Sequence, residues 1–234
     1  MISFIVPAYN EERLLDRTLT AIQAAARDLS TPYELIVVDD ASTDRTAAVA
    51  EAAGARVVRG EWRQISRVRN AGARASTGDI LIFVDADTVA PASVVRATIS
   101  AIESGAVGGG ACVMPEGRLP WWVPFAFRTF NFAMRRCGWA YGCYLFCTRP
   151  AFLATGGFDE GLFATEEIAF SRALGRIGRV TILREIVVTS GRKLRTHSFR
   201  EYAGLLFLLL RYGTGALRMR DRLSLWYGER RDET

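Results

Sequence analysis

Two carboxylates, one residue apart, follow a short apolar run near the middle of the chain. Ile80 to Val84 lead directly into Asp85-Ala86-Asp87. An apolar run of this length, bounded by turn residues, is typical of a buried parallel strand. Open α/β sheets carry their chemistry at the carboxyl ends of strands. We therefore expect one acid to bind a ligand hydroxyl and the other a divalent cation, because hard cations prefer oxygen ligands.

A second pair of acids, Asp39 and Asp40, follows another apolar run at residues 34–38. Neighbouring parallel strands end on the same edge of a sheet, so we expect both acidic pairs to converge there. A single Asp after a strand is as readily the cap of the next helix. The coincidence of two acidic strand ends favours a binding site.

Arg69 and the pair Glu166-Glu167 are further candidates for chemistry. Arg69 lies in an expected helix before residues 80–84, and its planar guanidinium suits base edges or phosphate. Glu166 and Glu167 begin a helix after a Gly-rich turn, where the helix dipole alone favours acids. The alternative is that one of them is a general base beside an acceptor hydroxyl.

The chain contains one histidine, His197, in a polar loop after an expected strand at residues 180–188. Imidazole is a common metal ligand, so His197 either completes a metal shell begun by Asp87 or is structural. The four cysteines lack Cys-x-x-Cys spacing, so we expect reduced thiols and no zinc site.

Strands and helices are expected to alternate along the first part of the chain. Apolar runs predict strands at residues 3–7, 34–38, 55–58 and 80–84. Helical spacing predicts three helices between these strands. The first is expected to follow Asn10 as its N-cap, the second to follow Ser42 or Thr43 as its N-cap, and the third to begin at Ile65. This alternation predicts a parallel, doubly wound α/β sheet. Later helices are expected at 92–103, about 119–136, 166–174 and 199–217, with strands at 107–114, 141–147 and 180–188.

Six short motifs resemble, in order and spacing over about residues 1–175, those of family 2 glycosyltransferases. They are Val6-Pro7-Ala8-Tyr9-Asn10-Glu11-Glu12, Val37-Val38-Asp39-Asp40-Ala41-Ser42-Thr43-Asp44, Arg69-Asn70-Ala71-Gly72, Asp85-Ala86-Asp87, Gly156-Gly157-Phe158-Asp159-Glu160 and Glu166-Glu167. Each motif is weak alone, but six in order are strong. The resemblance implies a GT-A fold, which is Rossmann-like and mostly parallel, here with a C-terminal helical extension.

The resemblance also implies a role for each matching residue in binding a nucleotide-diphospho-sugar. Pro7, Tyr9 and Glu11 would line the nucleotide site, Asp40 would read the base, Arg69 would help to hold it, and Asp85 would face the ribose or sugar. Asp87 would hold Mn²⁺ or Mg²⁺, and Glu167 would be the base. The family more often has Glu-Asp where Glu166-Glu167 stand, and often an Asp where Ala169 stands. Residues after 175 match no motif, so the acceptor is not implied.

The activity expected from this resemblance is a metal-dependent, inverting transfer of a sugar to an acceptor hydroxyl. A non-catalytic nucleotide-sugar-binding module is the alternative left open by the departure at Glu166-Glu167. A second alternative is a phosphatase of the haloacid-dehalogenase type, in which Asp85 would attack phosphate. That class places such a motif on its first strand, whereas three βα units precede Asp85 here.

The length of 234 residues is consistent with one domain and an appendage. We expect a GT-A domain at 1–198, with a donor half at 1–115 and an acceptor half at 116–198, followed by a basic amphipathic helix and tail at 199–234. The absence of a signal sequence and of an apolar run of about 20 residues predicts a cytoplasmic location.

The net charge of +5 is unevenly distributed along the chain. Residues 176–234 carry 13 basic residues against 6 acidic ones, whereas the rest carries 17 against 19. We therefore expect the segment 199–217 to be either a core helix or a helix that lies on an anionic membrane surface. In the second case the protein would bind the inner face of the membrane, and its acceptor would be a glycan or a lipid-linked molecule there. Trp121, Trp122 and Phe125 would join that surface or stack on an acceptor sugar. Nucleic acid is not an expected partner, because no motif for it accompanies the charge.

Overall fold

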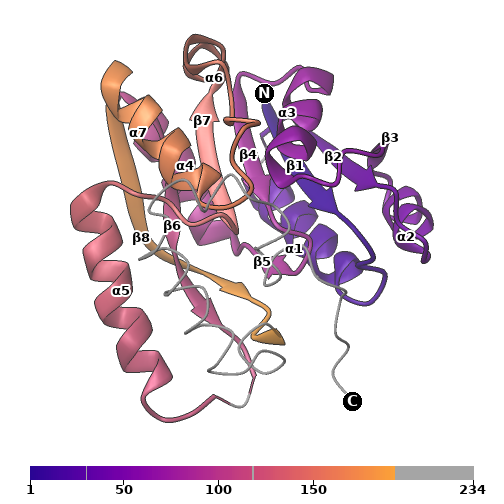
Figure 1. Ribbon diagram of the computed structural model, residues 1–234, viewed down its shortest axis with the longest axis horizontal. Coiled ribbons are helices and arrows are strands. Elements are labelled where there is room, and N and C mark those ends of the chain that lie inside the picture. The colour runs from indigo at the N-terminus through magenta and orange to yellow at the C-terminus, as the bar shows by residue number, and fades with distance from the viewer. Residues whose placement is uncertain (30, 118, 193–234) are drawn as a thin grey trace.

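The computed structural model describes residues 1–29, 31–117 and 119–192. In this part of the chain, one sheet has the strand order β3-β2-β1-β4-β7-β6-β8-β5 (Figure 1). The strands are β1 (Ile2–Ala8), β2 (Tyr33–Asp40), β3 (Arg56–Gly60), β4 (Ile80–Val84), β5 (Thr88–Val89), β6 (Ala106–Pro115), β7 (Tyr144–Thr148) and β8 (Arg179–Thr189). The helices are α1 (Leu15–Asp28), α2 (Thr46–Ala52), α3 (Ile65–Ala75), α4 (Ala92–Glu103), α5 (Val123–Cys137), α6 (Arg149–Thr155) and α7 (Glu166–Ile177).

The predicted α/β fold with a mostly parallel sheet is confirmed. Strand β1 pairs in parallel with β2 and β4, β2 pairs in parallel with β3, and β6 pairs in parallel with β8. Strand β7 runs antiparallel to both of its neighbours, β4 and β6, and β5 runs antiparallel to β8. The antiparallel insertion of β7 joins the first four strands to the later ones in a single sheet.

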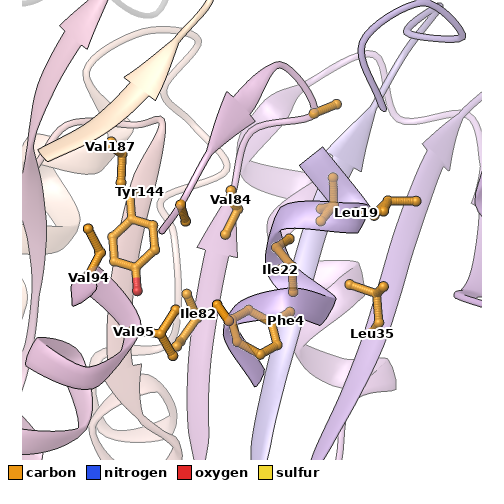
Figure 2. Close-up of a cluster of buried hydrophobic side chains, with 14 of the residues drawn as sticks. Phe4, Leu19, Ile22, Leu35, Ile82, Val84, Val94, Val95, Tyr144 and Val187 are labelled. Atoms are coloured by element: carbon orange, nitrogen blue, oxygen red, sulfur yellow. The ribbon is translucent and has the colours of Figure 1, made fainter. Parts of the chain in front are cut away.

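Helices cover both faces of the sheet because alternate strand residues are apolar on both sides. Phe4, Val6 and Ile82 face one layer, which includes Leu19 and Ile22 of α1. Figure 2 shows this cluster, in which the side chains of the sheet and of α1 and α4 meet. The intervening side chains face a second buried cluster with α3, α6 and α7. Burial on both faces explains the near-continuous apolar runs of β1, β2 and β4.

Two predicted helix caps are wrong. Helix α1 begins at Leu15 without a side-chain cap, and α2 begins at Thr46, beyond Ser42 and Thr43. Asn10 instead adopts a left-handed conformation, with φ of 51°, and its side-chain oxygen accepts a hydrogen bond from the Thr43 amide at 2.8 Å. The Ser42 hydroxyl accepts in turn from the Asn10 amide. Asn and Ser side chains therefore bond two loops together here, in competition with capping.

Among the described residues, no helix has the length and apolar character that a transmembrane span requires. The predicted helix at 199–217 lies outside the described residues, as does His197.

Candidate functional site

A buried guanidinium connects the strand-end acids to the start of α7. Arg69 of α3 donates from Nη1 to Glu166 at 2.7 Å and from Nη2 to Asp85 at 3.1 Å. Nη2 also donates to the backbone oxygen of Gly142 at 2.8 Å. Arg69 is only 2% exposed. The structure thus brings three of the sequence-predicted residues together in one ion-pair network, in which Arg69 and Glu166 are buried and Asp85 is half-buried.

The loop before β7 leaves room for this guanidinium because it contains a glycine. A Cβ atom at Gly142 would lie 3.2 Å from Arg69 Nη2. The next residue, Cys143, accepts a hydrogen bond from the Asp85 amide through its backbone oxygen. Sequence analysis gave no role to Gly142, because a single glycine in a loop has no distinguishing pattern.

The second member of the Arg69-Asn70 motif holds the Gly-Gly-Phe turn before α7. Asn70 donates to the Phe158 backbone oxygen and accepts from its amide, both at 2.9 Å. Gly157 has a φ of 78°, and a Cβ atom there would lie 2.7 Å from the Asn70 side-chain oxygen. The Phe158 ring lies 5.4 Å from the Arg69 guanidinium. Two motifs far apart in sequence are therefore one structural unit that supports Arg69.

Glu166 and Glu167 differ in their environments although they are adjacent. Glu166 is 5% exposed and its carboxylate is bound by Arg69. Burial, followed by the nearby charge of Glu166, raises the pKa of Glu167 to about 8. A carboxyl with a raised pKa, beside a charge network, is a candidate acid or base.

Asp87 lies two residues beyond Asp85, at the junction of β5 and β8. Its carboxylate accepts from the Thr88 and Thr189 hydroxyls, each at 3.4 Å, and lies 3.9 Å from Arg192 Nη2. Arg192 also forms a forked pair with Glu11, at 2.9 and 3.3 Å. Arg192 therefore connects a predicted nucleotide residue to the predicted metal ligand. No local pattern indicates the pairing of Arg192 with Glu11, because 181 residues separate the partners.

The donor set fits a divalent cation that takes most of its ligands from a substrate. Asp87 would supply a carboxylate oxygen, which hard cations prefer, while Asp85 stays the predicted ribose or sugar contact. Burial, and then the charges of Asp85 and Asp87, raise the pKa of the Cys143 thiol well above its usual range. Within the described ranges, no group of three or more His, Cys, Asp and Glu side chains forms a complete shell. Asp87 remains the predicted metal ligand.

The other predicted donor residues lie at or just beyond the carboxyl ends of β1 and β2. Pro7 is buried within β1, in register with Val38 of β2. Asp40 ends β2 and accepts from the Trp62 and Arg63 amides, at 2.6 and 2.9 Å. The Arg63 guanidinium lies 4.7 Å from the centroid of the Tyr9 ring. Asp40 thus orders a loop whose arginine covers Tyr9, and Arg63 is a site residue that sequence reasoning missed.

The fold, with acids at the ends of its parallel strands, is of the GT-A type. The chain belongs to the family described as Glycosyl transferase family 2, whose model matches residues 3–150. The match supports the glycosyltransferase interpretation over a phosphatase.

Named relatives and solved structures agree with this family. The chain is 31% identical over 156 residues to undecaprenyl-phosphate 4-deoxy-4-formamido-L-arabinose transferase of Serratia proteamaculans, covering 62% of this chain and 47% of that one. It is 31% identical over 130 residues to dolichol-phosphate mannosyltransferase of Pyrococcus furiosus, covering 53% and 36%. The mannosyltransferase PcManGT of Pyrobaculum calidifontis, solved with GDP-Man and Mn²⁺, superposes with a TM-score of 0.67 at 21% identity, covering 88% and 61%. The Mycobacterium tuberculosis glucosyl-3-phosphoglycerate synthase, with Mn²⁺ and UDP, gives 0.61 at 19%, covering 93% and 80%. The chain spans about half the length, or less, of the two sequence relatives.

Proposed function

We propose that the protein is a metal-dependent, inverting glycosyltransferase that uses a nucleotide-diphospho-sugar donor. The observation that carries the proposal is the network in which buried Arg69 holds Asp85 and Glu166 together. In this proposal Asp87, two residues beyond Asp85, serves the donor side of the site, and Glu167, next to Glu166, serves the acceptor side. Membership of glycosyl transferase family 2 supports the same conclusion.

On the donor side, Pro7, Tyr9, Glu11 and Asp40 line the nucleotide site, and Asp85 faces the ribose or sugar. Asp87 holds the ion, Mn²⁺ or Mg²⁺, with His197 as a further predicted ligand. When bound, the ion neutralises the negative charge that develops on the leaving diphosphate. Solved relatives in complex with Mn²⁺ support the choice of a divalent cation.

In the proposed reaction, an acceptor oxygen attacks the anomeric carbon of the sugar. The bond from that carbon to the diphosphate oxygen breaks, and a proton that the acceptor oxygen carries, on a hydroxyl or on a monoprotonated phosphate, passes to Glu167. A single displacement of this kind inverts the anomeric centre. Arg69 takes no part in bond making or proton transfer. Its contact with Asp85 orients that carboxylate, and its contact with Glu166 fixes the start of α7 and so positions Glu167.

Glu167 is preferred to Glu166 as the base because of their partners. Glu166 is bound by Arg69, and an acid held by an arginine is a weak proton acceptor. The raised pKa of Glu167, about 8, suits a group that accepts a proton near neutral pH.

We further propose that the acceptor is a lipid phosphate, and that the protein works at the inner face of a membrane as a peripheral protein. The names of two relatives, an undecaprenyl-phosphate transferase and a dolichol-phosphate mannosyltransferase, support this acceptor class.

A thermal-shift screen of nucleotide sugars with Mn²⁺ tests the donor site, because a bound ligand stabilises the folded state by mass action. We expect one donor class to raise the melting temperature only with the ion. The matched donor should then be transferred or slowly hydrolysed by the wild type. Donor binding without transfer or hydrolysis would instead identify a non-catalytic binding module. No stabilisation by any nucleotide sugar would contradict the proposal.

A further inference from the structure

We propose that the outer face of α5 docks the protein on an anionic lipid bilayer. This aromatic face consists of Trp121 and Trp122, which directly precede the helix, and of Phe125 and Phe132 on it. The inference deepens the proposed function, since it rests on the proposal of a lipid-linked acceptor and names the surface that reaches it.

The aromatic face is exposed to an unusual degree. Trp121 is 89% exposed, Phe125 74% and Phe132 65%, and Trp122 is exposed as well. Only Val123 and Asn131 are buried among the 15 residues of α5. Other exposed large side chains, such as Leu153 and Ile177, lie singly on other helices. A contiguous apolar patch of this kind marks an interaction surface.

The inner side of α5 holds the helix firmly to the sheet. The Asn131 side chain donates to the Val113 backbone oxygen at 2.9 Å and accepts from the Val113 amide at 3.0 Å. Figure 1 shows α5 along the outside of the sheet, beside β8. The helix is thus a fixed element with its aromatic side chains turned outward.

The charge of this part of the chain identifies the partner. Residues 117–158 contain no Asp or Glu, and α5 carries the exposed Arg128, Arg135 and Arg136. A helix that exposes aromatic side chains, and whose charged residues are all arginines, is typical of the interface of an anionic membrane. A second copy of the same helix is a poor partner, because its arginines would meet like charges and no acids.

The position of α5 fits an acceptor delivered from a bilayer. The chain leaves α5 at Cys137 and reaches Gly142, whose oxygen binds Arg69, within a few residues. Phe130 packs edge-on against Tyr141 of this connection, with ring centroids 5.1 Å apart. Docking by the aromatic face therefore brings the loop at the acceptor side of the site to the level of the lipid headgroups.

The test is co-sedimentation of the full chain, without donor or acceptor, with vesicles of phosphatidylglycerol and phosphatidylcholine or of phosphatidylcholine alone. We expect binding to the anionic vesicles only, weakened by salt. The triple variant Trp121→Ser, Phe125→Ser, Phe132→Ser and the double variant Arg128→Glu, Arg135→Glu should each lose about tenfold or more in partitioning. Two matched controls should bind as the wild type does: Leu153→Ser with Ile177→Ser, and Arg27→Glu with Arg59→Glu.

Three outcomes would overturn the inference. They are no binding of the wild type to anionic vesicles, equal binding by the α5 variants, and a wild-type dimer that the α5 variants convert to monomers. Equal binding would place the membrane contact in another segment, such as 199–234. Donor-induced thermal stabilisation of each variant shows that it is folded. Because that measurement is separate, loss of vesicle binding with retained donor binding leaves the proposed chemistry standing.

Discussion

Arg69 donates to Glu166 at 2.7 Å across 97 residues of sequence, and both side chains are buried. The same guanidinium reaches Asp85. Arg69 of α3 therefore links the end of β4, which leads to Asp85, with the start of α7, where Glu166 lies.

Removing this guanidinium should destabilise the protein strongly. Arg69→Ala leaves the Glu166 carboxylate buried and unpaired, for which we expect a loss of about 3–5 kcal/mol in the free energy of unfolding. Arg67→Ala is the matched control, because Arg67 and its partner Glu160 are largely exposed, and it should change stability by about 0.5 kcal/mol or less. Urea unfolding measures both. Equal midpoints for the two variants would show that the network is not structural.

The two adjacent glutamates should separate binding from turnover. Glu167→Gln removes the proposed base and keeps the printed contacts of Arg69 with Asp85 and Glu166, so donor binding should persist while transfer falls about 10²-fold or more. Glu166→Gln breaks the buried pair, so we expect a lower melting temperature as its first effect. Isothermal titration with donor and a transfer assay report the two properties. Wild-type turnover in Glu167→Gln would exclude Glu167 as the base.

The raised pKa of Glu167 also predicts how stability depends on pH. Its folded pKa, about 8, lies above the ordinary value of 4.5, so the folded protein binds this proton more tightly than the unfolded chain does. The contribution is fully present below the ordinary value and is lost as the pH rises toward about 8. Between these values, the melting temperature of the wild type should fall more steeply than that of Glu167→Gln. If the melting temperatures of the two proteins fall equally with pH, the pKa of Glu167 is not raised in the folded state.

Metal-dependent donor binding should require Asp87. Asp87→Asn weakens a hard-cation site by removing charge while keeping shape, so the extra stabilisation that Mn²⁺ gives with donor should disappear. Asp79→Asn, at an exposed carboxylate paired with the N-terminal amine, is the control and should keep it. The readout is the shift in melting temperature with donor, with and without the ion. If Asp87→Asn responds to Mn²⁺ as the wild type does, the metal site lies elsewhere.

Local patterns in the sequence predicted most of the fold. The apolar runs of β1, β2 and β4 and the acids after them lie where strand patterns placed them. The insertion of β7 between β4 and β6 was not predictable, since antiparallel pairing over 60 residues or more leaves no mark on local periodicity. The helix α6 was missed, and the caps at Asn10 and Ser42 were wrong because long-range loop contacts use these side chains.

The site was only partly predictable for the same reason. Strand ends and motifs indicated Asp40, Asp85 and Glu166, and the structure places the last two in one network. The pairing of Arg192 with Glu11, and the position of Arg63 over Tyr9, depend on chain segments that meet only after folding. The roles assigned to Asp87, Glu167 and the nucleotide residues stay predictions for the experiments above.

The place of β7 in the sheet has a consequence for synthesis on the ribosome. Strand β4 is complete at Val84, but the partner for its second edge begins only at Tyr144. The nascent chain therefore carries an open, apolar strand edge while about 60 more residues are added, and such edges invite wrong pairing. If the chain is divided near residue 115, β4 and β6 lie in the first fragment and their shared partner β7 lies in the second. We therefore expect the two fragments to fold together as a complex and not separately.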